Sequence, residues 1–441
     1  MKIAVAGTGI SGLSAAWLLS RHHDVTVFEK NARVGGHTNT AMVQTKAGPI
    51  AVDTGFIVYN TAAYPNLTAL FDHLGVATRA SEMSFAVSLN DGRLEYSGTD
   101  LKGLFAQRRN AVSPRFWSML RDIRRFYREA PLHGPQLGDH VTLSSYLATG
   151  GYGAPFRDDH LLPMAAAIWS APAATMLQYP ARSFIAFCAN HGLLQLTGRP
   201  VWRTVAGGSC SYIGKLSQAF RDRIRTSCGV SAIRRLADGI ELRDTNGTME
   251  RFDHVVLACH ADEALASLSD ADETERSLLS AFRYERNEAV LHSDPSFMPK
   301  RPAAWSSWNY TGESGRLSVT YWMNRLQGLP GPLPLFVTLN PSRDPGTDAV
   351  HLRETYSHPI FDPRALAAQQ RLWTLQGARR TWFCGAYFGS GFHEDGLQAG
   401  LAVAEALGGG MRPWIVAKPS GRIYLPAASA PRASWPAEAL A

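Results

Sequence analysis

Three glycines near the N-terminus have the spacing of a nucleotide-binding turn. One apolar run precedes them and a second follows, an order typical of a strand, a turn and a helix. Such glycines permit a tight turn, close approach of a pyrophosphate and close packing of helix on strand. The free N–H groups at the start of the helix favour an anion. We expect contacts with a dinucleotide from Gly7, Gly9, Ile10, Ser11 and Gly12.

An acidic residue follows the next apolar run at a matching distance. Glu29 ends the run 25–28 and lies 22 residues after Gly7, close to the separation of an acid that binds ribose hydroxyls. We expect the Glu29 carboxylate to hold the ribose, with Lys30 beside it. These features do not by themselves distinguish NAD from FAD.

Two further segments favour FAD. The sequence Arg33-Val34-Gly35-Gly36-His37-Thr38 follows Glu29 and suits a loop that folds back over a pyrophosphate. Near the other end, a buried strand at 382–384 precedes a polar turn and a small-residue helix, 397–407. The N-terminus of that helix would face the electron-rich end of an isoalloxazine ring.

These segments together resemble the flavin-containing amine oxidase and phytoene desaturase superfamily. Residues 53–60, 162–170, 190–194 and 257–260 are similar to one bacterial branch, usually called NAD/FAD-binding or amine oxidase-domain proteins. Members of that branch often accompany cyclopropane-fatty-acid-synthase-like methyltransferases. The resemblance covers roughly residues 1–412. It implies FAD as cofactor and an α/β fold: a Rossmann-like FAD-binding domain of the GR2 type with an inserted α+β substrate domain.

The resemblance also implies which further residues bind FAD. They are Arg33, Gly35, Gly36, His37, Thr38, Thr54, Gly55, Phe56, Val230, Cys259, Gly385, Glu394, Asp395, Gly396 and Leu397. Two positions depart from the superfamily. His37 stands where Arg or Lys is common, and a neutral imidazole carries no fixed charge. Ala386 stands where Asp is common. The roles that the basic residue and the Asp have in the superfamily are therefore not assigned to His37 and Ala386.

The length of 441 residues predicts two domains. We predict a discontinuous FAD-binding domain of residues 1–80, 200–265 and 376–412, and a substrate domain of residues 81–199 and 266–375. Residues 413–441 are rich in Pro and Ala and are expected to be disordered.

Turn signals and apolar runs predict the elements of these domains. Asp238-Gly239 and Asn246-Gly247 predict a three-stranded meander before a buried parallel strand at 255–258. The first insertion is expected to be mostly helical. The second insertion contains strand-rich segments at 288–292, 317–323 and 335–339.

Charge and cysteine content limit the class of protein. The net charge is +7, which favours nucleic acid or an anionic membrane as a partner, but no nucleic-acid module is present. Five cysteines without CxxC spacing indicate a reducing compartment, and Cys384 is expected to be a buried thiol. No signal peptide precedes the first strand, so we predict a cytoplasmic protein. The uncharged stretch 161–181 contains three prolines and is predicted to form a cavity wall, not a membrane span.

A basic amphipathic helix is predicted at 114–128. Apolar residues recur on one face, and the other carries five arginines from Arg115 to Arg128. Such a helix can lie on an anionic bilayer, which would place the protein peripherally at the inner membrane surface. The alternative is a substrate-domain helix with a solvated basic face, and we favour that alternative.

Candidate catalytic residues lie in segments predicted near the flavin: Tyr59, His191, His260, Tyr387 and His393. His393 immediately precedes the flavin-facing helix and is a candidate proton donor or acceptor; Tyr59 is the second choice. There is no GxSxG, HExxH or P-loop motif, which argues against a hydrolase triad, a metal site and a phosphate-binding loop.

The branch resemblance and the apolar segments favour an acyl substrate. We expect an FAD-dependent desaturase or dehydrogenase that transfers hydride from a lipid or fatty-acyl chain to flavin N5. Three alternatives stay open. They are a flavin amine oxidase, a redox-neutral isomerase of fatty-acid double bonds, and a non-catalytic flavin-binding partner of a lipid methyltransferase.

Overall fold

The computed structural model describes residues 1–169, 172–313 and 316–426. The chain divides into two compact units. The first consists of residues 1–32 and 220–280 and, among the described residues, 367–426; the second consists of residues 33–219 and 281–366. Each unit is built around its own sheet. None of the described helices is both long enough and apolar enough to cross a bilayer.

A five-stranded parallel sheet forms the centre of the first unit. Its strand order is β10-β2-β1-β14-β20, and all neighbouring pairs are parallel. These strands are β1 (Lys2–Ala6), β2 (Asp24–Phe28), β10 (Ile224–Arg225), β14 (His254–Leu257) and β20 (Thr381–Phe383). Residues 3–6 are all buried, as a central parallel strand covered on both faces requires.

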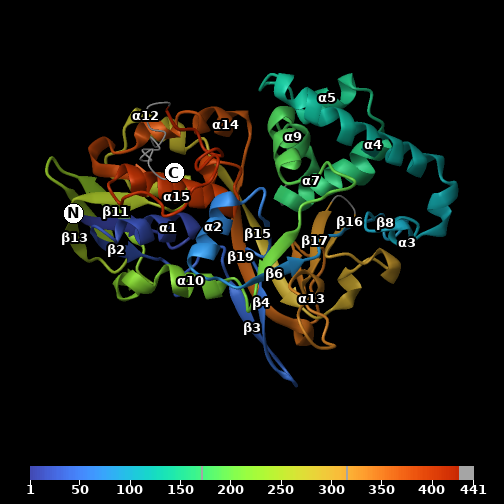
Figure 1. The fold of residues 1–441 in the computed structure, drawn as a ribbon, viewed down its shortest axis with the longest axis horizontal. Coiled ribbons are helices and arrows are strands. Elements are labelled where there is room, and N and C mark those ends of the chain that lie inside the picture. The colour runs from blue at the N-terminus through green and yellow to red at the C-terminus, as the bar shows by residue number, and fades with distance from the viewer. Residues whose placement is uncertain (170–171, 314–315, 427–441) are drawn as a thin grey trace, which may run out of the picture. The chain divides into compact units, whose positions relative to one another are not determined.

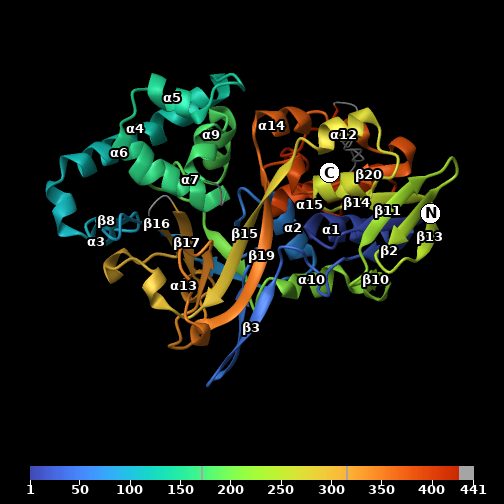
Figure 2. The same ribbon diagram turned by 180° about the vertical axis from the view of Figure 1, so that it is seen from behind.

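Helices and a small second sheet complete this unit. The helices are α1 (Ile10–Leu19), α11 (Ala261–Ser267), α12 (Glu273–Leu279) and α15 (His393–Ala406). Figure 1 and Figure 2 show α1 and α15 side by side. The antiparallel meander consists of β11 (Val230–Arg235), β12 (Ile240–Asp244) and β13 (Met249–Phe252). The predicted meander and the parallel strand after it are thus confirmed.

A seven-stranded mixed sheet forms the centre of the second unit. Its order is β19-β15-β18-β17-β16-β7-β8, and only the β16–β7 pair is parallel. The strands are β7 (Phe85–Leu89), β8 (Leu94–Ser97), β15 (Arg283–His292), β16 (Trp308–Glu313), β17 (Arg316–Trp322), β18 (Phe336–Leu339) and β19 (Val350–Ile360). The long strands β15 and β19 run side by side in Figure 2.

Two smaller sheets of the second unit lie close to the predicted FAD segments in sequence. One is the hairpin of β3 (Thr40–Thr45) and β4 (Gly48–Asp53). The other has the order β5-β9-β6 and consists of β5 (Tyr59–Asn60), β6 (Thr78–Ser81) and β9 (Trp202–Val205).

The helices of the second unit come mainly from the first insertion. They are α2 (Pro65–His73), α3 (Leu101–Leu104), α4 (Pro114–His133), α5 (Leu143–Thr149), α6 (Ala154–Phe156), α7 (Leu162–Trp169), α8 (Ala173–Leu177), α9 (Ala181–Asn190), α10 (Cys210–Leu216) and α13 (Met323–Leu326). In a further helix, α14 (Pro363–Gln369), the chain passes from the second unit, which ends at residue 366, to the first, which resumes at residue 367. The segment predicted as a cavity wall forms α7 and α8, and its residues 170 and 171 lie outside the described part.

The two compact units do not coincide with the predicted FAD-binding and substrate domains. Residues 33–80 and 200–219, which we assigned to the FAD-binding domain, pack in the second unit. Their assignment to the cofactor stays a prediction. Residues 413–426 of the predicted disordered tail instead contact the first unit, where Trp414 stacks on Trp17 with ring centroids 5.8 Å apart. The rest of that tail, 427–441, lies outside the described residues.

Candidate dinucleotide site and its surroundings

The three motif glycines have three different environments at the turn from β1 to α1. Gly7 has φ +108°, and a Cβ there would lie 2.7 Å from the carbonyl oxygen of Ala258. A Cβ on Gly12 would lie 2.0 Å from the carbonyl oxygen of Gly7, whereas one on Gly9 would meet nothing within 4 Å. The turn is therefore closed on the protein side at two glycines and open at the third.

The glycine turn lies where the order of the parallel strands reverses. Chain order runs outward from β1 to β2 and β10 on one side and to β14 and β20 on the other. Gly7 follows β1 and packs against the backbone that follows β14, at Ala258 and Cys259. In open parallel sheets, ligands bind outside the carboxyl ends of the strands at this reversal. Gly9 is the N-cap of α1 and supplies no capping side chain, which leaves that helix end suited to an anion.

The predicted ribose acid is buried and already hydrogen-bonded. Glu29 Oε2 accepts hydrogen bonds from the N–H of Thr8, at 3.0 Å, and from the Thr8 hydroxyl. Its Oε1 accepts from the N–H and the side-chain amide of Asn31, at 2.9 and 3.0 Å. These bonds fix the carboxylate beside the glycine turn.

The small residues of α15 allow it to approach α1 closely. A Cβ on Gly396 would lie 2.9 Å from the side chain of Ile10, and one on Gly400 would lie 2.2 Å from the carbonyl oxygen of Ser11. The predicted segments around Gly385 and Cys259 meet as well, because a Cβ on Gly385 would lie 3.6 Å from the Cys259 carbonyl oxygen. The structure thus brings the glycine turn, the 258–259 segment and the start of α15 together.

The first turn of α15 carries buried carboxylates with partners of their own. Asp395 is fully buried; its Oδ2 accepts from the N–H of Phe392, and its Oδ1 lies 2.6 Å from Nε of Arg422. Burial raises the pKa of Asp395, and the Arg422 guanidinium opposes that rise. Glu394 accepts a hydrogen bond from Gln398 at 2.8 Å, and Leu397 is buried in the core.

Burial argues against one of the two roles predicted for His393. It lowers the pKa of the His393 imidazole to about 3, so the ring is neutral at pH 7. A proton donor in the imidazolium form is therefore disfavoured. Cys384 is fully buried, and burial raises the pKa of its thiol to about 12, as expected of an inert thiol.

Two other predicted residues lie on the meander side of the same unit. Lys30 forms an ion pair with Glu263 at the start of α11. Val230 begins β11, and a Cβ on the preceding Gly229 would lie 2.9 Å from Cβ of Lys30. The structure thus brings the start of β11 close to Lys30, the residue that follows Glu29.

The second glycine pair forms a tight loop in the second unit. Gly35 and Gly36 have φ of +121° and +57°, which favour glycine. Nη1 of Arg33 donates to the carbonyl oxygen of Gly36 at 2.6 Å, so this arginine stabilises the loop itself. The imidazole of His37 lies 5.0 Å from the ring of Tyr356.

This loop packs directly on the predicted Thr54-Gly55-Phe56 segment. The N–H of Phe56 donates to the carbonyl oxygen of His37 at 2.8 Å, and a Cβ on Gly55 would lie 2.0 Å from that oxygen. The Thr54 hydroxyl is 2.9 Å from the Tyr356 hydroxyl, and the Thr38 hydroxyl is 2.6 Å from that of Tyr212. The predicted residues of this unit therefore form one contiguous group.

A buried carboxylate anchors that group. Asp53 is fully buried and accepts from the N–H and the hydroxyl of Ser209, each at 2.8 Å, and from Thr40 at 2.6 Å. It also accepts from the side-chain amide of Gln327 at 2.7 Å. Burial nevertheless raises the pKa of Asp53 to about 6, because desolvation outweighs these hydrogen bonds.

This raised pKa predicts a specific pH dependence of stability. The ordinary pKa of 3.8 applies to the unfolded chain, so between about pH 4 and 6 the native state holds the proton more tightly. The contribution of Asp53 is fully present below pH 4 and is lost as the pH rises through 6, by about 3 kcal/mol. Denaturant unfolding of wild type and Asp53→Asn from pH 4 to 7 should give a stability difference that changes by this amount. Parallel pH curves would contradict the prediction.

Tyr59 packs in an aromatic region, and its catalytic role stays a prediction. Only 2% of Tyr59 is exposed, and its ring lies 5.3 Å from that of Phe71. The neighbouring Asn60 is fully buried; its Oδ1 accepts from the N–H of Ala63, but its Nδ2 has no hydrogen-bond partner among the described residues.

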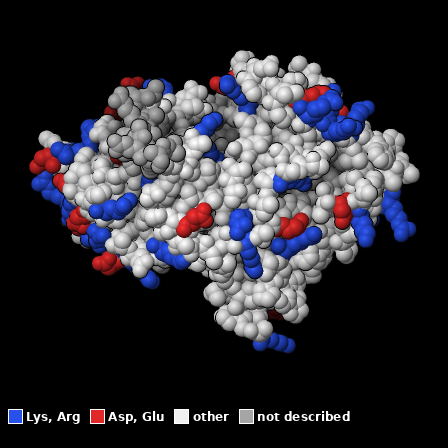
Figure 3. All heavy atoms as spheres, viewed as in Figure 1, with Lys and Arg blue, Asp and Glu red and all other residues white. Residues whose placement is uncertain are grey.

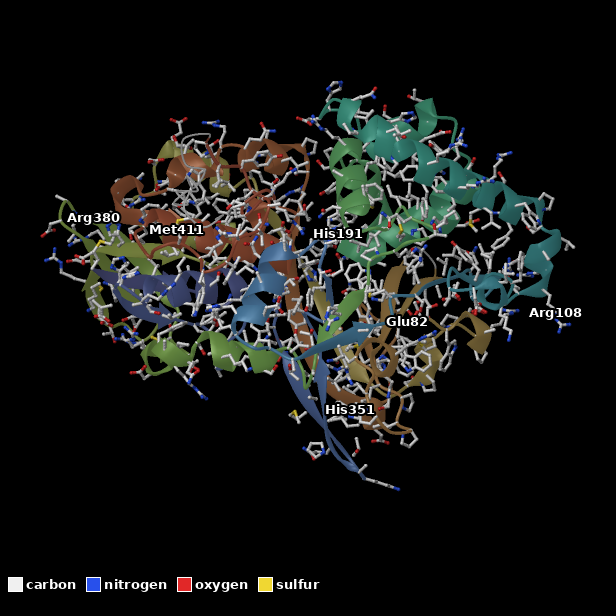
Figure 4. All side chains as sticks on the ribbon, in the orientation of Figure 1. Glu82, Arg108, His191, His351, Arg380 and Met411 are labelled. Atoms are coloured by element: carbon white, nitrogen blue, oxygen red, sulfur yellow. The ribbon has the colours of Figure 1, made fainter. Side chains whose placement is uncertain are left out.

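A chain of rings in contact, here called the aromatic wall, continues from this point. His191 follows α9, as Figure 4 shows, and stacks on Phe187 with ring centroids 3.9 Å apart. Phe187 in turn lies 4.6 Å from Trp169. The rings of Tyr64 and Trp202 lie 5.7 and 6.3 Å from His191. The aromatic wall thus comprises Tyr64, Trp169, Phe187, His191 and Trp202.

Several residues that shape these groups were not predicted. Tyr356, Ser209 and Gln327 reach the loop or Asp53 from distant parts of the chain, and Arg422 reaches Asp395 from the predicted disordered tail. A second glycine pair, Gly207-Gly208, directly precedes Ser209 and has positive φ at both positions. That pair is the only signal in the sequence that could have drawn attention to Ser209.

Comparison with known proteins identifies the family. The profile described as "Flavin containing amine oxidoreductase" matches residues 10–290, more than half of the chain. A short stretch of 40 residues is 58% identical to the 4,4'-diapophytoene desaturase (4,4'-diaponeurosporene-forming) of Staphylococcus aureus; it covers 9% of this chain and only 8% of that enzyme.

Solved structures share the whole fold at low sequence identity. A putrescine oxidase bound to putrescine aligns with a TM-score of 0.67 and 15% identity, covering 92% of this chain and 99% of that one. A fatty acid isomerase from P. acnes aligns with a TM-score of 0.66 and 16% identity, covering 92% and 97%. A cyclohexylamine oxidase from Brevibacterium oxydans gives 0.65 and 18%, covering 92% and 99%. At these identities the likeness is one of fold.

Proposed function

Because the chain belongs to the family of flavin-containing amine oxidoreductases, we propose that it desaturates or dehydrogenates a fatty-acyl or phospholipid-acyl chain. The chain is an FAD-dependent oxidoreductase of this family. The proposal concerns the substrate and the bond that is oxidised.

The residues of the first unit fit FAD. The open space at Gly9 and the uncapped start of α1 suit the pyrophosphate, and Glu29 suits the adenosine ribose. The Arg33–Thr38 loop and the Thr54–Phe56 segment of the second unit stay predicted FAD contacts from the sequence. FAD would supply the two-electron oxidant for such a reaction: double-bond formation would transfer a hydride from one carbon to the flavin and release a proton from the adjacent carbon to solvent.

One observation carries the choice of an acyl substrate. Asn60 Nδ2, Trp169 Nε1 and Trp308 Nε1 are among the buried side-chain nitrogens of the second unit that have no hydrogen-bond partner among the described residues. All three carry N–H groups. An unsatisfied buried donor is costly and needs an acceptor. The carbonyl or carboxylate oxygens of an acyl group supply acceptors.

An ammonium substrate fits these groups less well, because an ammonium group can only donate. No carboxylate oxygen is among the unpartnered buried side-chain atoms of the described residues. The apolar rings of the aromatic wall favour a hydrocarbon chain and exclude water from it. The named fatty acid isomerase and desaturase among the similar proteins also favour a lipid.

For the two residues predicted to be catalytic, we propose more limited roles. A neutral His393 would orient groups by hydrogen bonding rather than donate a proton as imidazolium. Tyr59 would act through packing. The lipid methyltransferase partner stays a prediction.

The proposal is tested by anaerobic reduction of the holoenzyme. The flavin absorbance is followed while a bacterial phospholipid extract, free fatty acids or a panel of amines is added. We expect bleaching with an acyl lipid, a new double bond in the product by mass spectrometry, and no bleaching with amines. Bleaching with amines alone would overturn the proposal. A shifted double bond without bleaching would assign the isomerase reaction instead.

Asn60→Leu tests the proposed acceptor contact. Removing the unpartnered donor should raise KM for the acyl substrate about tenfold with little change in kcat. The matched control is Asn324→Leu in the same unit, because both groups of the Asn324 amide are hydrogen-bonded within the protein. We expect that control to lose stability without a change in KM. Equal effects of the two substitutions on KM would contradict the assignment.

A further inference from the structure

The positive charge of the chain is concentrated in one segment of the second unit. Residues 101–133 contain eight Lys or Arg and two Asp or Glu, a net charge of +6, whereas the whole chain carries +7. Figure 3 shows Lys and Arg side chains over α4, and Figure 4 shows Arg108 extending outward from the same part of the molecule.

The apolar face of α4 is not available to a membrane. Phe116, Met119, Ile123, Phe126 and Ala130 are all buried inside the unit. The helix therefore cannot lie on a bilayer through that face, as the sequence pattern alone would allow. Protein therefore covers the apolar face of α4, and the basic face is exposed.

The exposed side of α4 is nevertheless not purely polar. Trp117, Arg121, Arg124, Arg128 and Leu132 are three or four residues apart and share one side of the helix, and all five are exposed. Trp117 is 52% and Leu132 is 66% exposed. An aromatic and an aliphatic side chain thus flank three arginines.

The segment before α4 repeats this combination. Leu101 and Val112 are 75% and 81% exposed, and Lys102, Arg108 and Arg109 are exposed in the same segment. Of the twelve large apolar side chains that are exposed in the described part of the chain, four lie between residues 101 and 132. These residues together are called the α3–α4 surface.

Much of this charge has no internal partner. Arg115 has a partner: Asp159 accepts two hydrogen bonds from it, at 2.8 and 3.0 Å. Lys102, Arg108, Arg109 and Arg124 form no ion pair with any described residue. The charge of these four side chains is therefore available to an external anion.

We propose that the α3–α4 surface docks on a bilayer that contains anionic phospholipid. Lys and Arg side chains attract the anionic headgroups, and Trp, Leu and Val side chains enter the interface between headgroup and acyl chain. A nucleic acid would engage the arginines but would offer little to Val112 or Leu132. The surface does not depend on the proposed substrate, so docking and lipid oxidation can fail separately.

Flotation of the FAD-loaded full chain with lipid vesicles tests the proposal. We expect binding to vesicles of phosphatidylcholine mixed with phosphatidylglycerol, weakening with added salt, and little binding to phosphatidylcholine alone. The triple variant Arg121→Gln, Arg124→Gln, Arg128→Gln should bind at least about tenfold more weakly. The control removes three exposed arginines of the meander, by Arg234→Gln, Arg243→Gln and Arg251→Gln, and should bind like wild type.

A second variant separates a bilayer from other anionic partners. Leu101→Ser, Val112→Ser and Leu132→Ser leave the charge intact and should weaken vesicle binding about tenfold. Trp117 is left unchanged because its Nε1 donates to the carbonyl oxygen of Ala111. Unchanged vesicle binding by this variant, or equal binding by the two arginine variants, would overturn the proposal. Retention on DNA without vesicle binding would do so as well and would assign the surface to a nucleic acid.

Discussion

Gly9→Ala is expected to fold normally but to bind FAD poorly, whereas Gly12→Ala is expected to lose its fold. An alanine methyl at position 9 enters open space in the protein but would occupy the place where the pyrophosphate approaches the backbone. At position 12 the methyl would lie 2.0 Å from the Gly7 carbonyl oxygen. The backbone must then move, at a cost of roughly 4 kcal/mol or more of the unfolding free energy.

Two measurements separate these outcomes. The ratio of flavin to protein absorbance reports FAD content, and denaturant unfolding of the FAD-free proteins reports stability. For Gly9→Ala we expect FAD affinity to fall roughly 100-fold and stability to change by less than about 1 kcal/mol. Gly214→Ala in α10 is a control, because a methyl there also meets nothing within 4 Å. Full FAD content in Gly9→Ala would refute the proposed site.

Arg422→Ala is expected to destabilise the first unit by about 3–5 kcal/mol. The substitution leaves the fully buried Asp395 carboxylate without the guanidinium that lies 2.6 Å away. Because Asp395 lies in the first turn of α15, the predicted flavin-facing helix, we also expect lower FAD content. Thermal unfolding and flavin absorbance measure the two effects.

The pH dependence of this variant has a defined sign. Burial already raises the pKa of Asp395, and Arg422 opposes the rise. In Arg422→Ala the folded-state pKa lies further above the unfolded value, so the penalty is greatest at high pH and shrinks as Asp395 takes up a proton. The stability deficit should therefore be smaller at pH 5 than at pH 8. Arg251→Ala, which breaks an exposed ion pair with Asp238, should cost less than about 1 kcal/mol at either pH.

Local sequence patterns were enough to predict the helices and strands of the nucleotide-binding half. The run before Gly7, the Asp-Gly and Asn-Gly turns and the small-residue helix after Gly385 each predict their own element, because the apolar period and the turn residues act within a few neighbours. The predicted strands of the second insertion are β15, β17 and β18 for the same reason. The family resemblance then supplied FAD.

Long-range contacts explain what the sequence did not predict. Asp53 meets Ser209 and Gln327 across 156 and 274 residues, and no local signal links such positions. The amphipathic pattern at 114–128 predicted a helix with an apolar and a basic face but left open whether protein or lipid covers the apolar face. The tail was predicted to be disordered from its composition, which does not reveal that Arg422 reaches a buried carboxylate.

Local sequence patterns predict the cofactor of this protein, whereas its proposed substrate depends on contacts between distant segments. Binding of a pyrophosphate needs glycines and a helix end that are adjacent in the chain. The motif at residues 7–12 can therefore be recognised from the sequence alone. The buried donors Asn60, Trp169 and Trp308 come from three separate segments, and only folding shows which of their N–H groups are left without an acceptor. The acyl substrate proposed above rests on those unsatisfied groups, because burial decides the cost of leaving each N–H without an acceptor.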